Sequence, residues 1–164
     1  MLADADIDRA DHLAPGDADV LRLHAALYEV SGHYQKAIGF YDQLVAKAPT
    51  VEALNGRCWA RAEWGRELAL ALADCDAALK LGPGAASVLD SRGLVLLRLG
   101  RYADAVASYD DALRVRPGQA ESLFGRGLAR LRVGSKTEGN VDLAAARAAK
   151  SGVDSEFARF GVAP

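Results

Sequence analysis

Four prolines of this chain lie 34 residues apart, at Pro15, Pro49, Pro83 and Pro117. Proline has no backbone N–H group and cannot continue a helix, so each of these residues is expected close to a helix end. A fixed period of this length is typical of repeat proteins, in which each unit packs on its neighbours. The period by itself therefore predicts a solenoid.

Apolar and small residues within the unit 86–119 follow the periodicity of two helices. Leu89 and Gly93 lie four residues apart on the first, and Ala105 and Tyr109 lie four residues apart on the second. This spacing places each pair on one helical face. The small residues allow the two helices to approach closely, so the unit is predicted to be a helical hairpin that ends at a proline.

This order of large, small, aromatic and alanine positions, closed by a proline, resembles the tetratricopeptide repeat. The resemblance covers roughly residues 3–150. It implies an all-α fold, a right-handed α-α superhelix (solenoid) of antiparallel helix pairs. Arg is more frequent than Lys and Ala is abundant, which favours a bacterial member of the family.

A single domain is expected over residues 1–164. In its second repeat the apolar pattern starts one residue early, which predicts a connector shortened by one residue after Pro49 and a turn lengthened by one near Arg66. The expected units are a half-repeat at 3–15 with a second helix only, repeats at 18–51, 52–85 and 86–119, a degenerate repeat at 120–151, and a capping helix at 154–160.

Charge and motifs exclude several classes of function. The net charge is −2, from 20 basic and 22 acidic residues spread along the chain, which does not support binding to nucleic acid or to a membrane surface. No apolar run is long enough to insert into a membrane. Catalytic and phosphate-binding motifs are absent, and the histidines lack the spacing of metal ligands. We therefore expect a protein that is not an enzyme and has no cofactor or metal, placed in the cytoplasm, or in the periplasm if a signal sequence precedes Met1.

Cys58 and Cys75 both occupy core positions of the second repeat. Buried cysteines of this kind are most often small apolar residues, which is the interpretation we favour. A redox pair is the alternative, because the two helices that carry these residues face each other. The sequence has no C-x-x-C motif that would support redox or metal chemistry.

A second series with the same period consists of aspartates. Each Asp lies 15 or 16 residues before a basic residue on the first helix of the next repeat, and these helices are neighbours in a solenoid. Because an unpaired buried charge is costly, we predict a ladder of ion pairs between repeats rather than an anion-binding row of arginines. The predicted pairs are Asp8–His24, Asp42–Arg57, Asp76–Arg92 and Asp110–Arg126.

The family resemblance implies that the first helices of the repeats line a concave groove. We expect an exposed apolar strip along it, made by Trp59, Phe124 and four leucines, with charges such as Glu29 and Glu63 nearby. Such a strip usually marks an interaction site, so a peptide or an amphipathic helix of a protein partner is the expected ligand. The expected partner-binding residues are Arg22, Asn55, Trp59, Asp90, Leu94, Leu97, Phe124, Leu128 and Leu131.

Three alternatives to a partner in the groove stay open. A C-terminal helix bearing Phe157 and Phe160, an upstream segment or a second copy of the chain could cover it. The half-repeat at 3–15 suggests, as a second alternative, an interaction module trimmed from a larger protein that is catalytic or exported. The domain could also serve homo-oligomerisation.

Overall fold

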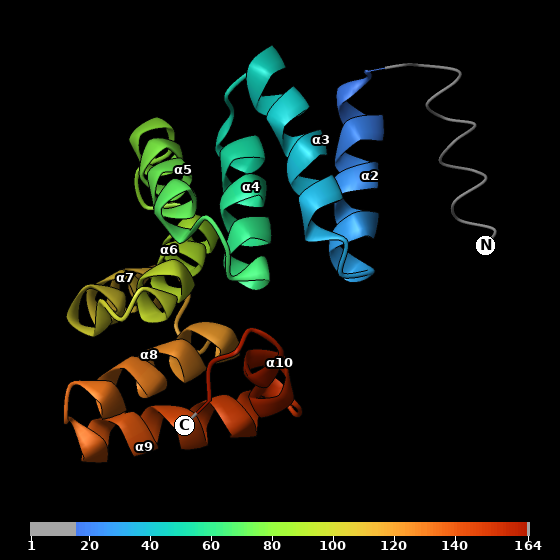
Figure 1. Cartoon of the computed structure of the whole chain (residues 1–164). Coiled ribbons are helices and arrows are strands. Elements are labelled where there is room, and N and C mark those ends of the chain that lie inside the picture. The colour runs from blue at the N-terminus through green and yellow to red at the C-terminus, as the bar shows by residue number, and fades with distance from the viewer. Residues whose placement is uncertain (1–15, 164) are drawn as a thin grey trace.

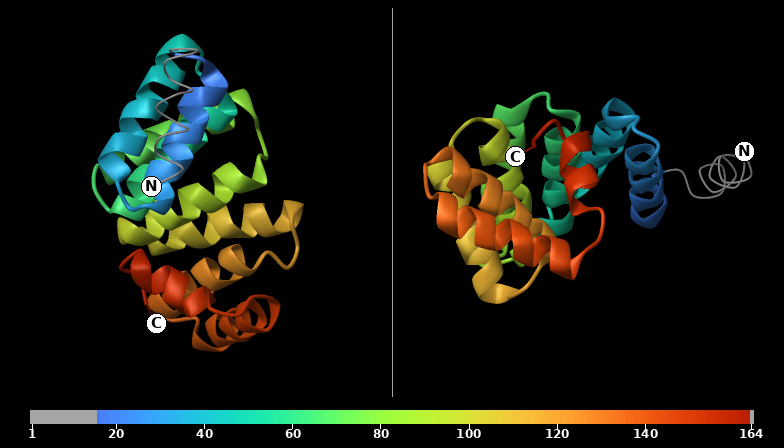
Figure 2. Two further views of the ribbon diagram at one scale, coloured as in Figure 1. Left: turned by 90° about the vertical axis from the view of Figure 1, so that its right-hand side faces the viewer. Right: turned by 90° about the horizontal axis from the view of Figure 1, so that it is seen from below.

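The computed structural model describes residues 16–163, and all regular secondary structure in this range is helical (Figure 1). Consecutive helices pair as hairpins, which stack side by side in chain order (Figure 2). The fold is the all-α, right-handed solenoid that the sequence predicts. The expected half-repeat at 3–15 lies outside the described residues. The helices are α2 (Ala18–Val30), α3 (Tyr34–Lys47), α4 (Val51–Trp64), α5 (Leu68–Leu81), α6 (Ala86–Arg98), α7 (Tyr102–Val115), α8 (Ala120–Arg132), α9 (Lys136–Ala149) and α10 (Val153–Arg159).

Local chemistry explains where the helices begin and end. Pro49, Pro83 and Pro117 lie in the connectors between successive hairpins, as their missing N–H group predicts. Thr50 caps α4, because its hydroxyl accepts a hydrogen bond from the backbone N–H of Ala53 at 3.2 Å. These signals delimit the hairpins that stack into the solenoid.

The second hairpin departs from its neighbours at only one end. Its connector, 48–50, is one residue shorter than the connector 82–85, which confirms the predicted shortening. The predicted lengthening of the turn near Arg66 is wrong, because the turn 65–67 has the same length as the turn 99–101. The extra residue belongs to α4, which has 14 residues where α6 has 13.

The hairpins close by placing a large side chain on a small one. Tyr109 of α7 lies over Gly93 of α6, where an added Cβ would come within 2.7 Å of its ring. Leu143 of α9 lies over Gly127 of α8 in the same way. Glycine is needed at both positions because no larger residue leaves room for the partner helix.

The matching contact of the second hairpin is a disulfide between Cys58 and Cys75, whose Cα atoms are 5.7 Å apart. Both side chains are buried, but the favoured interpretation of two separate apolar cysteines is wrong. The reason is their register, since Cys58 and Cys75 occupy the places that Gly93 and Tyr109 hold one repeat later. Side chains that face each other this closely across a hairpin are within reach of a bond.

The ladder between repeats is confirmed wherever both partners are described. The arginine-to-aspartate distances are 2.8 Å for Arg57–Asp42, 2.7 Å for Arg92–Asp76 and 2.7 Å for Arg126–Asp110. The pair Asp8–His24 lies outside the described residues. These ion pairs neutralise partly buried guanidinium groups at each repeat boundary.

Each ladder arginine also has a partner inside its own hairpin. Arg57 binds Asp74, and Arg126 binds Asp142, while the hydroxyl of Ser108 accepts a hydrogen bond from Arg92. These three partners are themselves spaced 34 residues apart. The periodicity could therefore have revealed them, although only the first aspartate series was used for the prediction.

Candidate functional site

The first helices of the four described hairpins, α2, α4, α6 and α8, line the concave face of the solenoid. The short C-terminal helix α10 lies on this face, where it contacts α8 and α9. Its far end reaches α4, since the rings of Phe160 and Trp59 lie 5.6 Å apart in an edge-on contact. In the right-hand view of Figure 2, α10 overlaps the N-terminal hairpins, and Figure 1 shows that it lies below the lower end of α4.

The C-terminal half of the concave face is filled by α10. The ring of Phe157 packs 4.8 Å from that of Phe124, and both residues are buried. Coverage by the C-terminal helix, one of the open alternatives, is therefore what the structure shows for this half. The expectation of an exposed apolar strip is wrong here, because Phe157 of α10 packs on Phe124 and the strip residues of this half are buried. The buried strip residues are Leu94, Leu97, Phe124 and Leu128.

Two other expected groove residues serve the interior. Leu131 packs against α9, where Gly139 lacks the side chain that would otherwise clash with it. Asp90 is buried and accepts a hydrogen bond from the hydroxyl of Ser122. Burial raises the pKa of Asp90 to about 6, although the Ser122 hydrogen bond acts in the opposite direction. Neither side chain is placed to contact a ligand directly in this arrangement.

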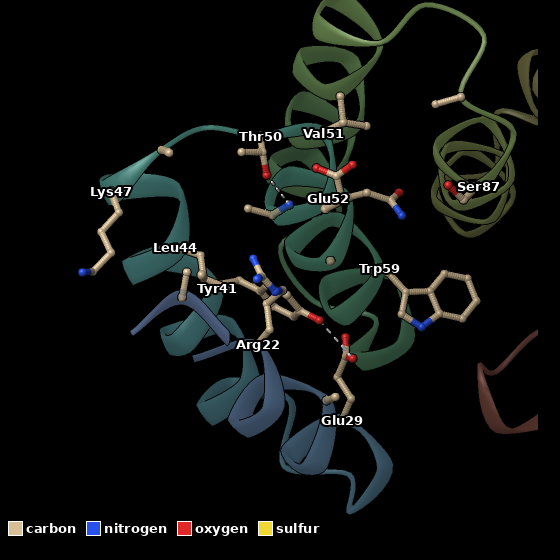
Figure 3. A pocket seen from close by; sticks show the side chains of 17 residues that line it. Arg22, Glu29, Tyr41, Leu44, Lys47, Thr50, Val51, Glu52, Trp59 and Ser87 are labelled. Carbon is tan, nitrogen blue, oxygen red and sulfur yellow. Dashed lines mark hydrogen bonds between the residues drawn. The ribbon is translucent and has the colours of Figure 1, made fainter. Parts of the chain in front are cut away.

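The N-terminal half of the concave face holds a cleft of about 640 Å³ between α2 and α4 (Figure 3). Three of the expected residues line it, namely Arg22, Asn55 and Trp59. Arg22 is exposed and forms an ion pair with Asp19, one turn earlier on α2. Three of the nine expected groove residues thus border this cleft and six do not. Two of those six, Leu97 and Leu128, line a smaller cavity of about 320 Å³ beside the C-terminal residues 161–163.

A second cavity of about 480 Å³ adjoins this cleft toward α10. The two share Glu29 and Trp59 as lining residues, so they meet at that point. The second cavity is also lined by Glu63, Arg159 and Phe160. Together the two cavities run from the N-terminal end of α2 to the C-terminal helix α10.

Carboxyl groups with raised pKa values mark the place where the cavities meet. Burial, and then repulsion from Glu63, raise the pKa of Glu29 to about 7, while a hydrogen bond from Tyr41 lowers it. Burial likewise raises the pKa of Glu63 to about 7, with Arg159 acting in the opposite direction and Glu156 adding repulsion. Glu29 and Glu63 line the same cavity, and both are readily protonated near neutral pH.

Two buried acceptor atoms near this place have no partner within the described residues. The hydroxyl of Tyr41 donates to Oε2 of Glu29 at 3.3 Å, but Oε1 of Glu29 is buried and makes no hydrogen bond. The same holds for Oδ1 of Asn55. Buried polar atoms are usually paired, so these oxygens are available to a ligand that brings donors.

Sequence reasoning placed Glu29 and Glu63 on the groove side without a reason to single them out, and it missed Tyr41. Tyr41 comes from α3, a second helix, and reaches the cleft because its ring packs over Gly56 of α4. An added Cβ at Gly56 would lie 2.2 Å from that ring. The pairing of a tyrosine with a glycine on the next hairpin is the signal that could have found it.

Other kinds of site find no support in residues 16–163. No group of three or more His, Cys, Asp or Glu side chains there could hold a metal ion. No helix in this range is long and apolar enough to cross a membrane. These statements concern the described part of the chain only.

The comparisons with known proteins agree with this architecture. A model of the tetratricopeptide repeat family matches residues 91–153. No curated protein matches the sequence.

Several solved structures share the fold at low identity. TTC0263, a thermophilic TPR protein of Thermus thermophilus, is 22% identical with a TM-score of 0.77, and the match covers 94% of this chain and 85% of that one. MamA is 19% identical with a TM-score of 0.72 over 93% and 87% of the two chains. YrrB, described as a TPR protein with an unusual peptide-binding site, is 18% identical with a TM-score of 0.68 over 89% and 75%.

Proposed function

Because this chain belongs to the tetratricopeptide repeat family, whose fold serves as a scaffold for protein partners, we propose that it is a non-catalytic scaffold that binds a peptide segment of another protein. The binding site is the cleft between α2 and α4. The observation that carries the proposal is that α10 fills one half of the concave face and leaves this cleft open, with a tryptophan at its edge.

The size and lining of the cleft suit a peptide. Its volume of about 640 Å³ falls within the usual range of ligand sites, and it combines apolar walls with a few polar groups. Trp59 is the anchor, since large aromatic residues contribute most binding energy in desolvated places. Arg22 and Asn55 supply polar contacts along the peptide. YrrB is described as having a peptide-binding site, which makes such a role plausible for this fold.

Filling the cleft tests the proposal without removing any core contact. Ala26 is exposed and lines the cleft, so Ala26→Trp should block it while leaving the fold intact. Ala73 is exposed on α5 and lies outside the cleft, so Ala73→Trp is the matched control. Peptides from a displayed random library should be enriched on the wild type and on Ala73→Trp, and should bind Ala26→Trp at least tenfold more weakly.

Two results would contradict the proposal. One is a set of peptides that bind Ala26→Trp as tightly as the wild type, which would place the site elsewhere. The other is a solution mass that doubles with concentration in the wild type but not in Ala26→Trp, which would make a second copy of the chain the occupant of the cleft.

A further inference from the structure

The carboxyl groups of Glu29 and Glu63 lie where the cleft meets the second cavity. Within residues 16–163, neither Glu29 nor Glu63 forms an ion pair, unlike the ladder aspartates Asp42, Asp76 and Asp110. Arg22, on the same helix as Glu29, is already paired with Asp19. Arg159 of α10 lowers the pKa of Glu63 but forms no ion pair with it. A cationic ligand would relieve the repulsion between the two carboxylates.

The two acceptor atoms in the cleft that lack a hydrogen bond also favour a cationic ligand. Oε1 of Glu29 and Oδ1 of Asn55 are both acceptors, and both are buried without a hydrogen bond. A Lys ammonium group has three donors and an Arg guanidinium group has five, and neither has an acceptor. Hydrogen bonds from such groups to a carboxylate are among the strongest that proteins make. A neutral donor would satisfy the atoms but would leave the charge.

Trp59 lies where the stem of a long basic side chain would pass. It borders both cavities together with Glu29. In Figure 3 the Glu29 carboxylate points toward Tyr41, and the indole ring of Trp59 extends from α4 away from α2. Lys and Arg bury their methylene groups along apolar surfaces while the charged end reaches a polar group. A cation beside an indole ring gains further attraction from the ring's negative face.

Asn55 lies one helical turn from Trp59 along α4, a rise of about 6 Å. A peptide of two or three residues spans this rise. Oδ1 of Asn55 is therefore placed to accept an N–H group from the residues next to the basic one. The two acceptors together favour a peptide over a free amine.

Building on the proposed peptide-binding function, we infer that the peptide carries a Lys or Arg side chain that inserts between Glu29 and Trp59. Its charged end binds Oε1 of Glu29 and faces Glu63, and its stem packs on Trp59. The residue is a specificity determinant, because a peptide with a carboxylate at this position would meet two negative charges.

The test uses the intact chain and the peptides enriched by the library selection. Wild-type-selected sequences should share one Lys or Arg, and replacing it by norleucine, which keeps the stem and removes the charge, should raise the Kd for the wild type about tenfold. Glu29→Gln removes the protein's charge with the same shape and should raise the Kd for the basic peptide by a similar factor. Glu138→Gln is the matched control, since Glu138 of α9 is exposed and lies outside the cleft.

The outcomes separate this inference from the function on which it rests. The inference holds if the norleucine peptide binds wild type and Glu29→Gln equally well, while the basic peptide binds Glu29→Gln more weakly than wild type and binds Glu138→Gln as tightly as wild type. Peptides that need an open cleft but have no shared basic residue would overturn the inference and leave the proposed function standing. If no peptide depends on the cleft, both are wrong. Circular dichroism of each variant shows that the fold is retained.

Discussion

The two halves of the concave face carry similar backbones and opposite surfaces. In the C-terminal half, α6 and α8 present apolar side chains such as Leu94 and Phe124, and the chain covers them with Phe157 of α10. In the N-terminal half, α2 and α4 present Glu29 and Asn55, and a cleft stays open in front of them. Large exposed apolar patches are rare in monomeric proteins. The comparison teaches that the apolar positions of the groove are covered and belong to the protein interior. The half that stays open is the half with polar side chains.

The hairpins behind these two surfaces are also closed differently. In the third hairpin the contact between helices is Tyr109 on Gly93, and in the second it is the disulfide between Cys58 and Cys75. At equivalent positions, side-chain packing joins the two helices of the third hairpin, and a covalent bond joins those of the second. The hairpin with the covalent bond is the one that borders the open cleft.

The largest effect should come from uncovering the closed half. Phe157→Ala removes a buried aromatic side chain, and such changes usually cost about 3–5 kcal/mol. We expect α10 to detach and the leucines beneath it to bind a hydrophobic dye, with faster hydrogen exchange in α8 and α10. Ser155→Ala, at an exposed site on the same helix, should change neither measurement. Unchanged dye binding by Phe157→Ala would mean that α10 does not cover this face.

Reduction of the disulfide should weaken the open half selectively. A bond between residues 17 positions apart in the chain stabilises a protein by about 3 kcal/mol. Thermal unfolding of the wild type should therefore shift to lower temperature in reducing agent, and exchange should quicken in α4 and α5 more than in α6 and α7. The double variant Cys58→Ala, Cys75→Ala should not respond to the reductant. Two titratable thiols in the unfolded, unreduced protein would contradict the bond.

A smaller effect concerns pH. The pKa values of Glu29 and Glu63 are raised from 4.5 to about 7, so the folded state binds more protons than the unfolded state between these values. Their ionisation therefore lowers stability as pH rises from about 4.5 to 7. Both pKa shifts come mainly from burial, and both groups are partly exposed to solvent, which reduces this cost, so we expect about 1 kcal/mol.

The double variant Glu29→Gln, Glu63→Gln measures this effect. Its midpoint of thermal unfolding should exceed that of the wild type by roughly 2–4 °C at pH 8 and by little at pH 5. Glu52→Gln should show no such dependence, because its side chain is exposed. An equal shift at both pH values would show that the pKa values of these two carboxyl groups are not raised in the folded protein.

Several features were predictable because they repeat. The prolines placed the helix ends, and the aspartates spaced like them predicted the ion pairs with Arg57, Arg92 and Arg126. The disulfide was not predicted, since burial and the absence of a C-x-x-C motif are equally compatible with two separate thiols. The covering of Phe124 by Phe157 was only one alternative among several, because the two residues belong to segments whose relative placement has no period.

The sequence by itself determined the hairpins, their stacking and the ion pairs between repeats, because each depends on residues that recur at a fixed spacing and meet their nearest neighbours. Only the tertiary structure decided which groove positions are open. Whether Trp59 borders a cleft and Leu94 is buried depends on where α10 lies across the concave face. That placement is set by contacts between distant parts of the chain, such as Trp59 with Phe160, which no local pattern encodes.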